Sequence, residues 1–175
     1  ELARESAGLA ERARIEIQET PRARPSEKTV LTDGMMLRAA APVISEGTLL
    51  GVLYGGVLLN RSTGIVDGVK RTAYGSETWQ GKDIGTATIF QDDVRIATNV
   101  MARDGSRAIG TRVSEEVYDR VIREGGRWVA RAFVVDDWFI TAYGPIRDLE
   151  DRIVGILYVG VLAGKFEAMR ARTVW

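Results

Sequence analysis

The sequence predicts an α+β domain, in which a five-stranded antiparallel sheet carries one helix inserted after its second strand. Two observations predict it. Short β-prone runs with alternating apolar residues follow one another between polar turns, which is typical of antiparallel strands. One helical stretch, opened by the N-cap residue Ser114, interrupts these runs between the second and the third.

The first half of this domain is expected to be a helix followed by a hairpin. The helix is expected over residues 69–80. Strands at 86–90 and 94–100 then flank a polar turn at 91–93, and both strands are rich in β-branched and apolar residues. We therefore expect these two strands to pair with each other.

The second half begins with the inserted helix. Ser114 caps it, Glu115 and Glu116 complement the dipole of its first turn, and the glycine pair at 125–126 ends it. Three strands follow, at 128–135, 138–146 and 155–162, with a two-residue turn at 136–137 and an exit helix at 165–175. The order is that of a sheet with a helix packed over one face.

The last strand pair has a counterpart near the start of the chain. Residues 155–162 (GILYVGVL) and 51–58 (GVLYGGVL) are identical at six of eight positions. A strand with a proline precedes each copy, at Pro42 and Pro145, so both copies predict strand, hairpin loop, strand. We therefore expect residues 1–68 to be a partial copy of the module, with a helix within 2–17, and residues 69–164 to be a complete one.

Composition excludes several classes of function. The 24 basic residues equal the 24 acidic ones, so the chain lacks the positive charge that nucleic-acid binding needs. There is no histidine and no cysteine, which removes most metal sites and the commonest catalytic groups. Three acidic pairs, at 92–93, 115–116 and 136–137, stand at turns or at a helix start, where acids have local reasons to occur. We expect no enzyme, no metal site and no cofactor.

Six stretches, taken in order, resemble one known family. They are residues 85–91, 95–100, 108–114, 131–135, 138–146 and 155–161. Together they resemble the Cache superfamily of bacterial extracytoplasmic sensor domains, whose modules have a PAS-like fold, and most closely its fused double-Cache type. Such domains are the ligand-binding input regions of histidine kinases and methyl-accepting chemotaxis receptors.

The resemblance implies the setting of the domain. Residues 1–68 would be part of a membrane-distal module and 69–164 the membrane-proximal one, with the exit helix leading towards a transmembrane segment. The domain would be periplasmic, in a protein anchored in the membrane on both sides of it. A homodimer through residues 2–17 and the exit helix is also implied.

The candidate ligand-binding residues are Arg131, Trp138, Thr141, Tyr143, Tyr158, Phe90 and Phe133. A turn at 136–137 places Arg131 and Phe133 on one face of the sheet and Thr141 and Tyr143 on the other, and a slip of one residue exchanges the two sets. A guanidinium with nearby aromatic rings and hydroxyl groups suits a small organic anion such as a carboxylate. The alternative is that Arg131 is solvated or pairs with an acid, while the aromatic residues only form the core.

Two functions remain open at this point. The first is a sensor domain that binds a small organic anion and relays the signal through its C-terminal helix. The second is a ligand-free dimerisation or protein-interaction module that transmits a signal from a partner such as a solute-binding protein. A pocket filled by its own side chains would favour the second.

Overall fold

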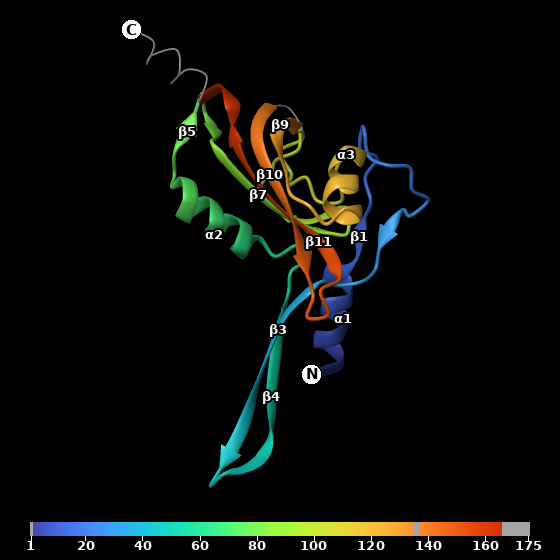
Figure 1. Ribbon diagram of the computed structural model, residues 1–175, viewed down its shortest axis with the longest axis vertical. Coiled ribbons are helices and arrows are strands. Elements are labelled where there is room, and N and C mark those ends of the chain that lie inside the picture. Colours follow the sequence, from blue (N-terminus) through green and yellow to red (C-terminus); the bar gives the residue numbers. More distant parts are fainter. Residues whose placement is uncertain (1, 135–136, 166–175) are drawn as a thin grey trace.

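The computed structural model describes residues 2–134 and 137–165 (Figure 1). Its helices are α1 (Leu2–Ala13), α2 (Thr63–Tyr74) and α3 (Glu115–Tyr118), the last continued by a π-helical turn, η1 (Asp119–Arg123). Its strands are β1 (Ile15–Glu16), β2 (Val30–Leu31), β3 (Met36–Ser45), β4 (Thr48–Leu58), β5 (Thr78–Trp79), β6 (Lys82–Asp83), β7 (Gly85–Gln91), β8 (Val94–Thr98), β9 (Trp128–Val134), β10 (Asp137–Arg147) and β11 (Ile153–Leu162).

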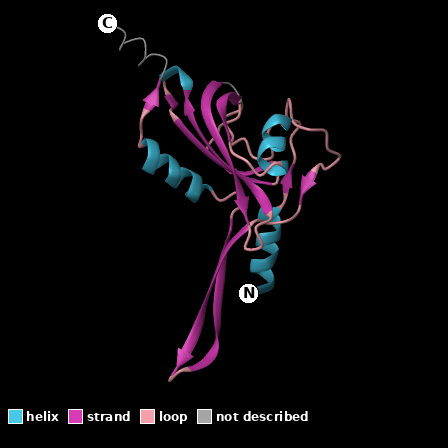
Figure 2. Ribbon diagram, viewed as in Figure 1, coloured by secondary structure: helices cyan, strands magenta, loops and turns pink. Residues whose placement is uncertain are grey.

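The central feature is a five-stranded sheet, whose strands are magenta in Figure 2. Its strand order is β8-β7-β11-β10-β9. Each neighbouring pair in it is antiparallel. The last strand in the sequence, β11, lies in the middle of the sheet between β7 and β10. The inserted helix comes between β8 and β9, the second and third strands of this sheet. The predicted α+β class and PAS-like sheet are confirmed.

The inserted helix covers one face of the sheet, which we call the inner face. Ser114 caps this helix as predicted, since its hydroxyl accepts a hydrogen bond from the Val117 amide at 3.4 Å. Val117 and Val121 pack with the buried residues of the sheet. The cluster they form contains Phe90, Val100, Ala108, Val113, Val117, Val121, Val134, Phe139, Tyr143, Ile156, Tyr158 and Leu162.

A second buried cluster lies on the opposite, outer face, where α2 packs against β7 and β8. It consists of Ile15, Leu31, Leu59, Val66, Ala87, Ile89, Val94, Ile96 and Ala97. The expected helix at 69–80 was wrong in its bounds, because Gly75 takes a φ of 63° and ends α2 there. The predicted boundary between 68 and 69 falls within α2. The assignment of residues 1–68 to a second module stays a prediction.

Strand β10 begins earlier than expected. Asp137 pairs with Val134 and Trp138 with Phe133, so Asp137 belongs to the strand and not to the turn. Its carboxylate lies 2.6 Å from the Lys82 ammonium, an ion pair that holds it at the start of the strand. The register differs from the expected one by two residues, so the two predicted sets still lie on opposite faces.

The two copies of the repeated strand pair both form hairpins, as predicted. The later copy is β10–β11, inside the sheet. The earlier copy is β3–β4, a separate two-stranded sheet whose tip extends away from the rest of the molecule (Figure 1). The expected exit helix, residues 165–175, lies mostly outside the described residues. After β11, the described chain is helical at residues 163–165.

A prediction on stability follows from this repeat. Gly155 pairs with Gln91 in the sheet, and a Cβ atom there would lie 2.1 Å from the backbone oxygen of Phe90. Gly155→Ala should therefore lower the free energy of unfolding by about 1–3 kcal/mol, because the backbone of β7 must move. Urea unfolding measures this. The matched control is Gly51→Ala, at the equivalent position of β4, where a Cβ meets no atom within 4 Å. Equal losses in the two variants would contradict the prediction.

Candidate functional site

Aromatic and hydroxyl side chains line up across the inner face. Tyr143 of β10 pairs with Tyr158 of β11, which pairs with Thr88 of β7, and Thr88 pairs with Thr98 of β8. Directly paired residues of an antiparallel sheet point to the same side, so these four side chains form one row. The rings of Tyr143 and Tyr158 are 4.8 Å apart between centroids. The row crosses four of the five strands below the inserted helix.

A buried arginine lies beside this row. Arg95 pairs with Phe90 across β7 and β8, and its guanidinium stands over the Phe90 ring at 5.2 Å from the centroid. The residue is only 6% exposed. Its guanidinium forms no hydrogen bond and no ion pair with any residue that the structure describes, and its buried Nε has no partner. Arg95 therefore carries a buried positive charge that nothing in the described chain neutralises.

The electrostatics follow from that burial. Loss of hydration lowers the pKa of Arg95, and the nearby Tyr143 and Tyr158 hydroxyls act in the opposite direction. Burial also raises the pKa of Tyr143 and of Tyr158, so both phenols stay protonated at neutral pH. An arginine keeps its proton in any protein environment. The arrangement therefore offers one cation and two neutral hydroxyl groups.

The hydroxyl groups differ in what they already bind. The Tyr158 hydroxyl is 2.9 Å from the Thr86 hydroxyl, and Thr141 donates to the Ala130 carbonyl at 2.9 Å. Tyr143 makes ring contacts with three aromatic neighbours, and its hydroxyl has no hydrogen bond to any described residue. Tyr143 is thus the hydroxyl that can donate to a ligand without breaking a bond.

The structure divides the seven predicted ligand residues between the two faces of the sheet. Phe90, Tyr143 and Tyr158 lie in the inner-face cluster, and Thr141 is buried in the same face. Arg131 and Trp138 lie on the outer face with the guanidinium 4.9 Å from the indole ring, and both side chains are exposed. Phe133 pairs with Trp138 through the backbone, and its side chain lies outside the described part of the chain.

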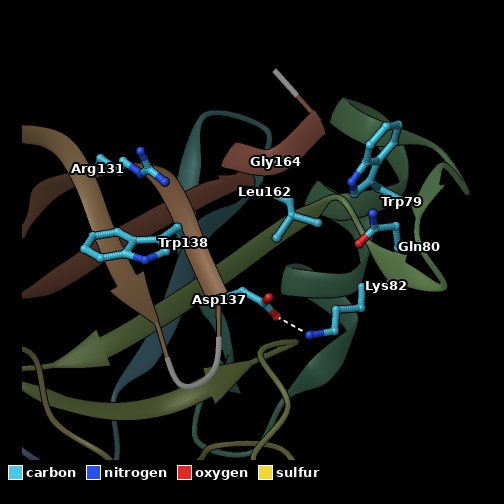
Figure 3. A pocket seen from close by; sticks show the side chains of 8 residues that line it. All are labelled: Trp79, Gln80, Lys82, Arg131, Asp137, Trp138, Leu162 and Gly164. Atoms are coloured by element: carbon cyan, nitrogen blue, oxygen red, sulfur yellow. Dashed lines mark hydrogen bonds and ion pairs between the residues drawn. The ribbon is translucent and has the colours of Figure 1, made fainter. Parts of the chain in front are cut away.

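Arg131 and Trp138 border a shallow pocket of about 230 Å³ (Figure 3). Trp79, Gln80, Lys82, Asp137, Leu162 and Gly164 complete its lining. Lys82 and Asp137 form an ion pair inside it, visible as the dashed line in Figure 3. An anion gains less from the exposed Arg131 than from the buried Arg95, because water screens the exposed charge.

The sequence analysis missed Arg95. The signal for it was present, since Arg95 is the only charged residue within β8, between two apolar neighbours. A charged residue at such a position is seldom left without a partner in a buried strand. The sequence analysis used only the alternating apolar residues of this strand and assigned no role to Arg95.

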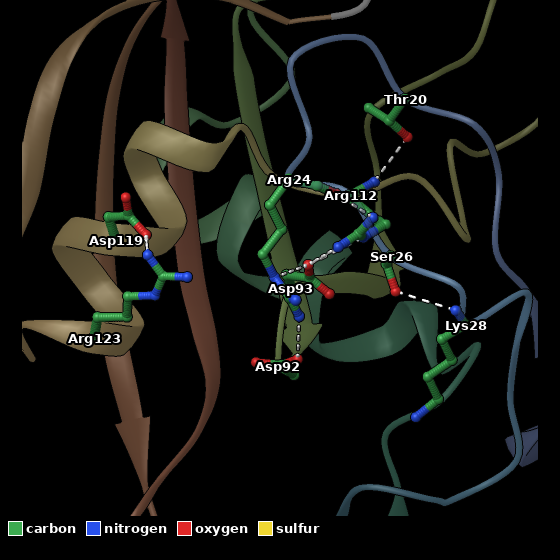
Figure 4. A network of polar contacts seen from close by, with 9 residues as sticks. All are labelled: Thr20, Arg24, Ser26, Lys28, Asp92, Asp93, Arg112, Asp119 and Arg123. Atoms are coloured by element: carbon green, nitrogen blue, oxygen red, sulfur yellow. Dashed lines mark hydrogen bonds and ion pairs between the residues drawn. The ribbon is translucent and has the colours of Figure 1, made fainter.

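The acidic pair at 92–93 has a structural role (Figure 4). Asp93 is buried, and Arg112 donates to its carboxylate from Nε at 3.0 Å and from the terminal nitrogen at 2.5 Å. Arg24 reaches the same carboxylate at 3.1 Å and also bridges to Asp92 at 3.2 Å. The guanidinium of Arg24 also lies over the Tyr118 ring. This network fastens the 20–28 segment to the turn between β7 and β8 and to the inserted helix.

Comparison with known proteins identifies the domain type. The family model described as "Single cache domain 3" matches residues 57–173. No curated protein and no solved structure matches the chain. The match is to a single Cache domain, so the fused second module expected upstream stays a prediction. Within the described residues, no helix has the length and apolar character needed to cross a bilayer.

The acidic network leads to a second prediction. Asp93→Ala should lower the free energy of unfolding by about 3–5 kcal/mol, because two arginines lose the carboxylate that neutralises them in a buried place. Thermal and urea unfolding measure this. Glu150→Ala is the control, since Glu150 meets Arg152 in an exposed pair at 3.3 Å, and its loss should change stability by less than about 1 kcal/mol. A similar effect of the two substitutions would refute a structural role for the Asp93 network.

Proposed function

The chain belongs to the single Cache domain 3 family and is therefore a sensor domain of the extracytoplasmic, non-catalytic type. We propose that it senses a small organic anion, which binds at Arg95. The observation that carries this proposal is the buried guanidinium with no neutralising group among the described residues. In the same proposal, the domain is the input region of a transmembrane signalling protein.

The energetics favour an anion at this place. A buried ion without a partner destabilises a fold by several kcal/mol. An anionic ligand offsets that cost, and a carboxylate does so with two parallel hydrogen bonds from the planar guanidinium. The binding free energy then includes recovery of the desolvation cost that the unpaired Arg95 imposes on the ligand-free domain. A neutral ligand would leave the charge of Arg95 in place.

The residues around Arg95 suit the remainder of such a ligand. The Tyr143 hydroxyl is a hydrogen-bond donor without a partner among the described residues. It lies near Arg95, whose positive charge counteracts the rise of the Tyr143 pKa that burial causes. Phe90 and Tyr158 are buried apolar surfaces that exclude water from the charge. Few polar groups within an apolar wall are typical of small-molecule sites.

The position of Tyr158 offers a route for the signal. Tyr158 lies in the middle of β11, and β11 ends at Leu162, directly before the chain leaves the sheet. A ligand that moves Tyr158 or its pairing with β7 shifts the end of the same strand. Relay of the signal requires that the ligand bind one of two conformations better, by about 1.4 kcal/mol for each tenfold shift in population.

One observation favours the other function, a ligand-free interaction module. Phe90, Ile156 and Tyr158 are fully buried, so the side chains of the inner face already fill much of the space below the inserted helix. A ligand must therefore displace side chains or be small. An interaction module would need no such space. Arg95 would then be a core residue that lowers the stability of the fold and binds nothing.

The test is titration calorimetry of the purified domain against a panel of small carboxylates. The wild-type domain should bind at least one of them, and Arg95→Met should weaken that binding by about 30-fold or more, because one partner of a buried charge pair is lost. In the absence of ligand, the same substitution should raise the free energy of unfolding by about 1–4 kcal/mol, since it removes an unpaired buried charge.

Arg131→Gln serves as the matched control on the outer face. Unchanged binding in this variant, together with loss in Arg95→Met, supports the inner site. Loss in Arg131→Gln alone would place the ligand in the pocket that Arg131 and Trp138 border instead. A wild-type domain that binds no carboxylate would favour the interaction module.

A further inference from the structure

The β3–β4 hairpin exposes an unusual amount of apolar surface. Leu53 is 72% exposed and Tyr54 75%. The large apolar side chains that the hairpin leaves exposed are Met36, Leu37, Val43, Ile44, Leu49, Leu50, Val52, Leu53, Tyr54 and Val57. They occupy both faces of the hairpin, since consecutive residues such as Leu53 and Tyr54 are included. A contiguous apolar surface of this kind marks a place of interaction.

The edge of β4 is open as well. The hairpin is a sheet of two strands, so β4 pairs only with β3 among the described residues. No charged residue and no proline stands in β4 from Thr48 to Leu58, whereas β3 contains Arg38 and Pro42. Charges and proline are the usual means by which an edge strand avoids further pairing. Therefore β4 is the edge of this hairpin that can accept another strand.

The repeat shows what this sequence does when it is covered. Tyr54 corresponds to Tyr158, and Val52 to Ile156, and in β11 both counterparts are 0% exposed. Strand β11 also has partners on both edges, β10 and β7. The β4 sequence is thus that of an interior strand, found here at an edge. An isolated two-stranded hairpin is only marginally stable in water, so a partner would stabilise it.

We infer that β4 is an association edge for a second copy of this chain, which pairs with it antiparallel through its own β4. The two hairpins then form one four-stranded sheet around a two-fold axis. Self-pairing fits the observations, because an uncharged strand brings no like charges together when it meets itself. Closed two-fold pairing is also the commonest symmetry of protein dimers.

The proposed contact is made by the edge of β4, whose 11 residues can pair with those of the partner along the whole strand. Full overlap of the two β4 strands puts Leu53 of one copy opposite Leu53 of the other, at the centre of the eleven-residue strand. In this register Leu53 meets its own counterpart, so substitutions at this one position test the pairing.

The first experiment is sedimentation equilibrium of the whole chain. The wild type should form a dimer, and Leu53→Lys should raise its dissociation constant about tenfold or more, because two like charges then meet at the two-fold axis. Leu149→Lys is the control, since Leu149 is fully exposed in the loop between β10 and β11 and lies outside the hairpin. A wild type that stays monomeric at high concentration overturns the inference, and so does a dimer that Leu53→Lys leaves intact.

The second experiment uses the absence of cysteine from the sequence. Leu53→Cys should give a disulfide-linked dimer under mild oxidation, because paired strand positions bring the two Cα atoms within the ~4.4–6.8 Å that a disulfide needs. Leu149→Cys in the same conditions should form little disulfide-linked dimer, because residue 149 lies outside the hairpin. Equal cross-linking of the two variants overturns the proposed pairing. Circular dichroism of each variant verifies that the five-stranded sheet is folded.

Discussion

The pairing of β11 with β7 is the contact on which the rest of the structure depends. It joins residues 85–91 to residues 155–161, which the inserted helix and three further strands separate in the sequence. Because β11 lies in the middle, every other strand of the sheet is placed relative to it. The row of hydroxyl and aromatic side chains on the inner face exists only through this pairing. Glycine at 155 and at 160 permits the close approach, since a Cβ at either position would overlap neighbouring atoms.

The same sheet explains why its two arginines differ so much. Arg95 is in an edge strand, yet it is buried on the inner face beside the aromatic residues. Arg131 is in the opposite edge strand and faces the outer side, where α2 packs against β7 and β8 and leaves β9 and β10 open. Burial without a counter-ion is unfavourable for folding, so a residue such as Arg95 needs a functional reason. The exposed Arg131 requires none.

The two copies of one short sequence show how environment decides the role of a strand. In β11 the residues are interior, paired at both edges, and form the core of a sensor domain. In β4, nearly the same residues are mostly exposed in the described structure. The family match begins at residue 57, so it includes only the end of β4. The hairpin differs from β10–β11 in that its apolar side chains lie exposed.

The sequence by itself determined the strand order along the chain, the hairpins and the N-cap at Ser114, because these depend on neighbouring residues. It also determined which residues of β9 and β10 share a face, because alternation along a strand is a local property. Only the tertiary structure decided that α2 ends at Gly75 and that Asp137 belongs to a strand. Burial of Arg95 was also decided there, because its aromatic neighbours come from β7, β10 and β11, the last two far along the chain. Local patterns specify elements, whereas the surroundings of a charge depend on which distant elements pack against it.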